Sequence, residues 1–454
     1  MEKVFKRICN VYSYILIFLV FMGQTFLKFK INNINFNVAR CCMLVVFFLL
    51  LIGFIINRKK LSIKNKNMKY ILIFYFIWGL FSIISFFWSI DIKMYLITNF
   101  FIITGIANIF FFTYFVDIKN NAKNYFFIMQ VALFVNCLYY IKIKDTTIGG
   151  FYHNTNDLAT AITFIFPITI YMLLNSKRVM GIIYNVLFFC VYYYSYTLIF
   201  SRANVLGIYT GFLFMLFLIF IKNRKVVLNS FKLKSIISSL AIITILLMLN
   251  MTNTNLGTVV SKPIESREED LIAEIKKDNS KKTTDKSKLD DNNELDEEEK
   301  DIIRSKHLYT SNEIRINLIY NTIDFLKKDY KLFTGVGTGN TIYYMENYAK
   351  FSTNYEYSVH NYWLEILLSN GILIFIGYII AYTFMIKNLV KHIDLKEKFE
   401  KIFKEEKVFY LFFLSAFIIA SISSSNMLTR EWIWIAFALI ISYIKNLSEQ
   451  KNEE

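Results

Sequence analysis

The sequence contains little of what marks a soluble enzyme or a metal protein. It has only two prolines and four histidines in 454 residues, and 19% of its residues are charged. Five cysteines are present, but none is spaced as Cys-x-x-Cys, so the pattern indicates neither a zinc site nor a disulfide framework. The glycine-rich run at 335–340 lacks the Gly-Lys-Ser/Thr ending of a nucleotide-binding phosphate loop.

Apolar residues dominate the chain instead. Hydrophobic residues make up 55% of it and aromatic residues 18%. Apolar runs near the roughly 20 residues needed to cross a bilayer recur along the sequence, which predicts an all-α polytopic membrane protein with about twelve transmembrane helices. The expected spans lie at 11–27, 39–56, 70–90, 94–116, 125–141, 158–174, 180–200, 203–221, 235–251, 371–389, 408–425 and 432–445.

Lysine and arginine predict how these helices are oriented. The net charge is +16, and basic residues gather in the loops after even-numbered helices, for example at 58–69, 222–234 and 387–407. Loops after odd-numbered helices are mostly short and poor in base, so the positive-inside rule places both termini in the cytoplasm. We therefore expect a multi-pass protein of the cytoplasmic membrane. Because the basic residues are spread over loops, we expect no binding of nucleic acid.

Under this topology the chain divides into three parts. Residues 1–251 hold helices 1–9, residues 252–360 form a large extracytoplasmic loop, and residues 361–454 hold helices 10–12 and a cytoplasmic tail. Within the loop, 252–310 is a charged insert that is too polar to fold alone and is expected to be flexible. Residues 311–360 show a helical apolar stripe, which predicts an amphipathic helix on the outer membrane surface followed by a flexible glycine-rich loop.

Three side chains on the outer side are candidates for chemistry. Arg202 stands between two apolar helices, where it would either face a polar pocket suited to a diphosphate or snorkel to lipid headgroups. His360 stands where the polar loop meets an apolar segment, and it would either exchange protons near neutral pH or merely cap a helix. Arg315 lies near the start of the expected amphipathic helix, and its alternative is an exposed helix charge.

A set of short motifs follows in order along the outer side. They are Asn-Thr-Asn-Asp-Leu-Ala at 154–159, Ser-Arg-Ala at 201–203, Arg315 ahead of Gly-Val-Gly-Thr-Gly-Asn at 335–340, and His360-Asn361 followed by Leu364, Leu367 and Gly371. Their order and spacing resemble the O-antigen ligase and polymerase family. The resemblance implies a membrane glycosyltransferase of the GT-C type that inverts the anomeric carbon and uses no metal or other cofactor. Ala203 departs from the glycine that is common in the family.

The resemblance also implies roles for particular residues and partners. It makes His360 the base on the acceptor hydroxyl, and Arg202 and Arg315 the residues that hold the donor diphosphate. The residues expected to support the substrate pocket are Asn361, Asn154, Asn156, Gly335 and Gly337. The implied substrates are a glycan linked to undecaprenyl diphosphate and a glycan acceptor, in contact with membrane lipids. A flippase and a chain-length regulator are candidate partners.

Three functions are compatible with this pattern. The first is a polymerase that joins lipid-linked repeats into a capsular, teichuronic-acid-like or other surface polysaccharide. The second is a ligase that transfers a finished glycan to another acceptor by the same chemistry. The third is a flippase or transporter without chemistry, but a transporter is expected to place charges near the bilayer midplane, whereas these charges lie at the outer ends of helices.

Overall fold

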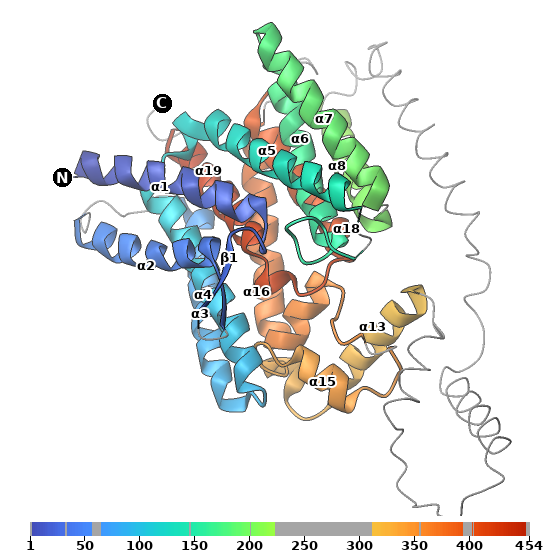
Figure 1. Ribbon diagram of the computed structural model, residues 1–454. Helices are drawn as coiled ribbons and strands as arrows, with labels where there is room; N and C mark the ends of the chain where they lie inside the picture. Colours follow the sequence, from blue (N-terminus) through green and yellow to red (C-terminus); the bar gives the residue numbers. More distant parts are fainter. Residues whose placement is uncertain are drawn as a thin grey trace, which may run out of the picture.

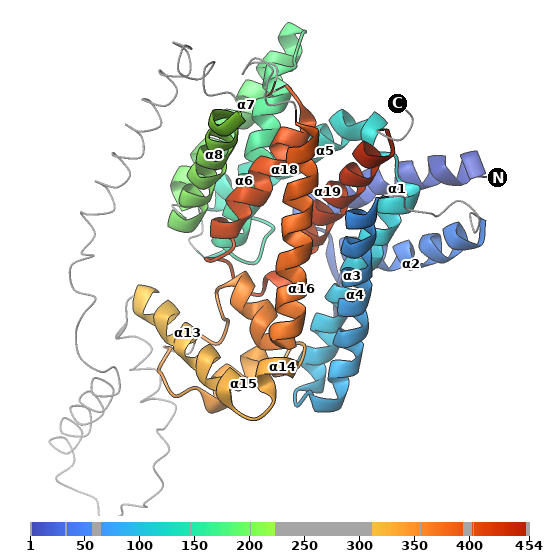
Figure 2. The ribbon, with the colours of Figure 1, turned by 180° about the vertical axis from the view of Figure 1, so that it is seen from behind.

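Long helices fill most of the chain that the computed structural model describes (Figures 1 and 2). The described residues are 2–31, 34–56, 65–144, 147–199, 201–222, 311–353, 356–393, 402 and 404–450. The ninth expected span, 235–251, and the charged insert at 252–310 lie outside these residues.

The elements follow one another as long helices with short connections. The first half contains α1 (Glu2–Met22), β1 (Lys28–Ile31), β2 (Ile34–Asn37), α2 (Val38–Ile56), α3 (Lys66–Ile84), the 3₁₀ turn η1 (Ser85–Trp88), α4 (Ile92–Phe115), α5 (Ile118–Ile143), α6 (Thr155–Leu174), α7 (Val179–Ile199) and α8 (Arg202–Lys222). The second half contains α13 (Ser311–Lys327), α14 (Lys331–Thr334), α15 (Thr341–Tyr348), α16 (Tyr362–His392), α18 (Glu406–Ala420), the 3₁₀ turn η3 (Met427–Thr429) and α19 (Glu431–Gln450).

The helices confirm a multi-pass membrane protein. Within the described ranges, 8 helices are long and apolar enough to cross a bilayer. They lie at Glu2–Met22, Val38–Ile56, Lys66–Trp88, Ile92–Phe115, Asn120–Ile143, Thr155–Leu174, Val179–Ile199 and Tyr362–His392. The helices α8, α18 and α19 occupy three further expected spans, but they are shorter or less apolar. The number of twelve spans stays a prediction.

The two C-terminal helices form the centre of the bundle. α19 packs against α4, α1 and α16, and α18 packs against α8 and α6. Between Trp432 and Ile441 every side chain of α19 is at most 3% exposed. A helix that is apolar on all sides belongs in a protein interior or a membrane, and here other helices surround it. Because lipid is as apolar as these side chains, close packing rather than exclusion of water holds the helices together.

α16 begins earlier than the sequence predicted and is broken in the middle. The expected span started at Gly371, whereas the helix starts at Tyr362 and has a break at Gly371, where φ is +77°. A Cβ at this position would lie 2.1 Å from the carbonyl oxygen of Phe333. The backbone N–H of Val336 donates to the carbonyl oxygen of Leu368 at 2.8 Å, so the break is filled by the glycine-rich loop. Glycine is needed here because a side chain would be strained and would clash.

The glycine-rich loop at 335–340 is buried, contrary to the expected flexible loop. Its last residue, Asn340, accepts hydrogen bonds from the backbone N–H groups of Ile90 and Asp91 at 2.9 and 2.8 Å. The loop therefore joins η1 and α4 to the break in α16.

A β-hairpin between α1 and α2 was not predicted. β1 and β2 pair antiparallel, with Lys28 opposite Asn37 and Ile31 opposite Ile34. Asn37 closes the hairpin by donating from its amide to the backbone carbonyl of Gln24. The hairpin thereby positions Gln24 and the start of α2 beside the site described next.

Candidate functional site

The N-terminus of α16 positions His360. Asn361 caps the helix, and its Oδ1 accepts from the backbone N–H groups of Trp363 and Leu364 at 3.1 and 3.2 Å. Such a cap satisfies backbone donors that the first helical turn leaves without partners. His360 directly precedes the cap and has a φ of +48°, a left-handed conformation that is uncommon for a residue with a side chain. The capping geometry therefore fixes the imidazole just outside the helix.

A carboxylate orients this imidazole. His360 Nε2 lies 3.0 Å from Glu356 Oε1, and the same oxygen accepts from the backbone N–H of Ser358 at 3.1 Å. Burial alone would raise the pKa of Glu356, but the hydrogen bond and charge of His360 hold that pKa below its ordinary value. The carboxylate thus stays ionised at neutral pH. His360 Nδ1 is buried and has no hydrogen-bond partner among the described residues, so it is the ring nitrogen that no described protein group occupies.

Two arginines at the starts of α8 and α13 lie near enough to interact electrostatically. Arg202 is the first residue of α8 and is exposed, while Arg315 lies in the second turn of α13 and is half-buried. Burial, together with the charge of the nearby Arg202, lowers the pKa of Arg315. In the described part of the chain neither guanidinium has a carboxylate partner. Two interacting cations with no carboxylate partner among the described residues are suited to binding a polyanion.

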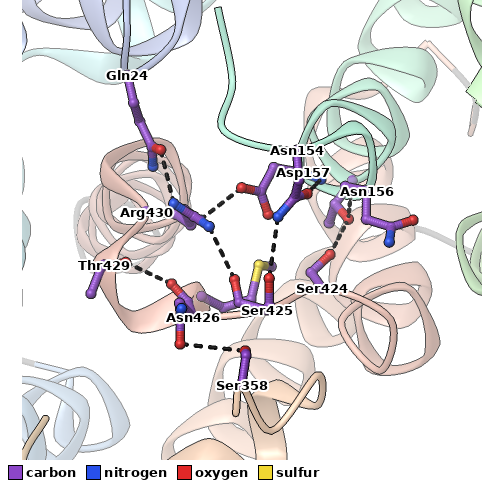
Figure 3. Close-up of polar contacts among 12 residues, drawn as sticks. Gln24, Asn154, Asn156, Asp157, Ser358, Ser424, Ser425, Asn426, Thr429 and Arg430 are labelled. Carbon is purple, nitrogen blue, oxygen red and sulfur yellow. Dashed lines mark hydrogen bonds and ion pairs between the residues drawn. The ribbon is translucent and has the colours of Figure 1, made fainter. Parts of the chain in front are cut away.

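A separate polar cluster is centred on Arg430, at the end of η3 (Figure 3). Its Nε lies 2.7 Å from Asp157 Oδ2, and these side chains are 7% and 0% exposed. Its other nitrogens donate to Gln24 Oε1 at 2.9 Å and to the carbonyl oxygen of Ser425 at 3.3 Å. Asp157 also lies near enough to His360 for an electrostatic interaction. This ion pair therefore ties the connection between α18 and α19 to the start of α6.

Residues at the start of α6 support the same cluster. Asn154 caps α6, because its Oδ1 accepts from the backbone N–H of Asp157 at 2.7 Å. Its amide donates to Ser425 Oγ at 3.2 Å (Figure 3). Asn156 contributes its backbone carbonyl, which accepts from Thr160 Oγ1 at 2.8 Å. Thr160 in turn pairs with Ser424 Oγ at 2.8 Å.

A pocket of about 330 Å³ lies beside this cluster. It is lined by Arg40, Met94, Ile97, Thr98, Phe101, His153, Gly339, Thr341, Ile342, Glu365, Ser369, Asn426, Thr429 and Arg430. Arg40 Nε contacts Glu431 Oε1 at 2.9 Å. Partial burial and then the charge of Arg430 lower the pKa of His153 to about 4, so His153 is neutral at neutral pH.

Comparison with known sequences identifies the group to which this chain is related. Residues 186–379 match the family model described as O-antigen ligase. This part of the chain is similar to the O-antigen ligase family. The matched range covers somewhat under half of the chain and contains Arg202, Arg315 and His360.

One curated relative is a teichuronic acid biosynthesis protein, TuaE, from Bacillus subtilis (strain 168). The chain is 33% identical to it over 142 residues. This alignment covers 31% of the present chain and 28% of the length of TuaE.

Six of the predicted site residues lie inside the O-antigen ligase match, and Asn154 and Asn156 precede it. The two glycines among them serve close packing in this structure. A Cβ at Gly335 would lie 2.5 Å from the carbonyl carbon of Ser369, and a Cβ at Gly337 would lie 2.9 Å from Ser89 Oγ. Both glycines therefore help to seat the loop on α16 and η1, next to the pocket.

Other residues of the site were not singled out from the sequence. Arg430 carries the same signal as Arg202, a charge in a short connection between apolar helices, and could have been found by it. Glu356 lies in an irregular segment where no periodicity indicates its direction. Among the described residues, no group of three or more His, Cys, Asp or Glu side chains could hold a metal ion.

Proposed function

We propose that the protein is a membrane glycosyltransferase that joins lipid-linked oligosaccharide repeats into a surface polysaccharide. One observation carries the proposal. The region that matches the family model contains His360, which has a carboxylate on one ring nitrogen, together with two arginines that have no carboxylate partner among the described residues. The printed name of TuaE, a teichuronic acid biosynthesis protein, agrees with a role in making an envelope polysaccharide. The site would face the outside of the cytoplasmic membrane.

The reaction is a displacement at the anomeric carbon of the donor sugar. His360 Nδ1 takes the proton of the acceptor hydroxyl, whose oxygen forms the new bond to the anomeric carbon. The bond between that carbon and the diphosphate oxygen breaks, and undecaprenyl diphosphate leaves with the electron pair. Attack from the face opposite the leaving group inverts the configuration.

The charged residues act at defined points of this reaction. Arg202 and Arg315 offset the negative charge that develops on the leaving diphosphate. Glu356 keeps the proton of the neutral imidazole on Nε2, so that Nδ1 carries the lone pair, and it stabilises the imidazolium that forms.

The test is made in a deletion strain that is complemented with wild type, His360→Ala, Arg202→Ala or Arg315→Ala at matched protein levels. Lipid-linked and surface glycans are separated on a gel. We expect single lipid-linked repeats without long chains in all three variants. His392→Ala and Arg178→Ala, at the far end of α16 and before α7, are matched controls and should retain full-length chains.

The outcomes separate the alternatives. Full-length chains that remain on the lipid carrier would indicate a ligase, because polymerisation would then be complete before the blocked step. Repeats trapped on the cytoplasmic face would indicate a flippase. Normal glycan in the His360→Ala strain would refute the proposed mechanism.

A further inference from the structure

The pocket beside Arg430 has two chemically different walls. One wall belongs to α4 and is apolar except for Thr98, with the ring of Phe101 beneath the Arg40 guanidinium at 4.9 Å. The rest of the lining is largely polar and includes Glu365, Ser369, Asn426 and Thr429. A sugar ring has the same division, with apolar C–H faces and a polar edge of hydroxyl groups. Pockets of about 300–1,000 Å³ accommodate small ligands, and this one lies at the small end of that range.

The charges of the pocket differ from those of the Arg202–Arg315 pair. Arg40 is paired with Glu431 at 2.9 Å, and Arg430 is paired with Asp157 at 2.7 Å. Each pocket arginine is therefore already neutralised, and a diphosphate would have to compete with buried carboxylates for it. Planar charged groups that are held in this way still present hydrogen-bond donors and acceptors to a neutral, hydroxyl-rich ligand.

The position of the pocket relative to His360 suits one particular substrate. Asn426 lines the pocket, and its Oδ1 lies 3.4 Å from Ser358 Oγ, two residues before His360. In both views of the molecule, α8 and α13 lie on one side of α16 and α4 lies on the other (Figures 1 and 2). The arginine pair belongs to α8 and α13, whereas the pocket is lined in part by α4 and contains neither Arg202 nor Arg315. In an inverting displacement the acceptor and the leaving group approach the anomeric carbon from opposite faces, so the acceptor needs a subsite separate from the arginines proposed to hold the diphosphate.

We propose that this pocket is the acceptor subsite, which binds the terminal sugar of the acceptor glycan through its hydroxyl groups. The identification of the bound sugar as the acceptor rests on the proposed function. The binding of a free saccharide in the pocket does not depend on turnover and can be measured by itself.

The probe is the repeat oligosaccharide that mild acid releases from the lipid-linked repeats of the deletion strain. Its binding to the full-length protein in lipid nanodiscs is measured by isothermal titration calorimetry. The pocket-filling variant is Ile342→Trp, on α15, whose half-buried side chain lines the pocket. The matched control is Tyr343→Trp, the next residue of α15, which is also half-buried but does not line the pocket. Glu365→Gln changes the polar wall while keeping its shape.

We expect Ile342→Trp and Glu365→Gln each to weaken binding of the oligosaccharide by about tenfold or more, which corresponds to about 1.4 kcal/mol. Tyr343→Trp should bind within about twofold of wild type. With lipid-linked repeats as donor and the free oligosaccharide as acceptor, the KM for the acceptor should rise in the two pocket variants while the KM for the donor stays unchanged.

Three results would overturn the acceptor subsite. They are unchanged binding in both pocket variants, an equal loss in Tyr343→Trp, and a rise in the donor KM alone. Monodisperse elution on size exclusion shows that each variant is folded. If wild type binds the oligosaccharide in the pocket but forms no product, the proposed function fails while the saccharide site stands. If it forms product but the variants bind normally, only the subsite fails.

Discussion

The buried ion pair between Asp157 and Arg430 should have a large and measurable effect on stability. The two side chains are 0% and 7% exposed, and they join elements that are far apart in the sequence. Removing one member of a buried pair leaves the other charge without compensation and typically costs about 3–5 kcal/mol. The structure allows the cost of each substitution to be ranked within that range.

Asp157→Asn should be the milder change. The guanidinium of Arg430 keeps its neutral acceptors, Gln24 Oε1 and the carbonyl of Ser425, and the new amide oxygen can accept as well. We expect a loss of about 3 kcal/mol in the free energy of unfolding. Arg430→Gln leaves the Asp157 carboxylate fully buried, with no other side-chain donor within hydrogen-bond distance in the described structure. We expect a loss of about 5 kcal/mol.

The double variant decides whether the pair itself is responsible. Asp157→Asn with Arg430→Gln removes both charges, so its loss should be about 3 kcal/mol smaller than the sum of the single losses. Unfolding is followed by circular dichroism during titration with sodium dodecyl sulfate in mixed micelles. The control is Asp324→Asn in the solvent-facing pair with Lys328, which should cost about 1 kcal/mol or less. Single losses that add up to within about 0.5 kcal/mol would refute the reasoning.

Three further predictions concern single residues around the site. Glu356→Gln should lower turnover of lipid-linked repeats about 100-fold. It should also move the acid limb of the pH–rate profile to lower pH, because an amide stabilises the protonated base less than a carboxylate does. An unmoved limb would mean that Glu356 has a purely structural role. Gly371→Ala should lower the yield of monodisperse protein on size exclusion, since its Cβ would lie 2.1 Å from a backbone oxygen at a φ of +77°. The control Gly79→Ala should be tolerated, because its Cβ would meet only the ends of two isoleucine side chains. The folded pKa of His153 is about 4 against an ordinary 6.5, so its contribution to stability is present above pH 6.5 and is lost as pH falls towards 4. His153→Gln should therefore show a smaller drop in Tm on acidification than wild type, and an identical drop would contradict this assignment.

The helices were the part of the fold that the sequence could predict. Apolar length alone marks a span, because a bilayer forces backbone groups to bond within the segment. The start of α16 was misplaced for the same reason. Residues 362–370 include polar side chains that weaken the apolar signal, yet they are helical because Asn361 forms the N-cap in front of them. The break at Gly371 depends on the contact of Val336 with Leu368, which the sequence does not show. The hairpin at 28–37 is too short to give a periodic signal.

The site was predictable only where one residue stands out in its own neighbourhood. His360, Arg202 and Arg315 were found because a charge or an imidazole interrupts an apolar or helical pattern. The role of Asp157 could not be found in this way. In the sequence it stands alone among neutral residues, and its partner Arg430 is brought to it by the packing of α18 and α19. Local pattern carries no information on such a pair.

Two arginines near the site have carboxylate partners and two have none among the described residues. This difference indicates which kind of ligand each pair can bind. An arginine in a membrane protein is costly unless something compensates its charge, and Arg40 and Arg430 have carboxylates that do so. Arg202 and Arg315 have none among the described residues, and their mutual repulsion costs additional free energy. An anionic ligand that contacts both guanidinium groups would supply a compensating charge. The diphosphate of the proposed lipid-linked donor has the charge for this role and a neutral glycan does not, so the arginine pair favours the donor over the acceptor as its ligand.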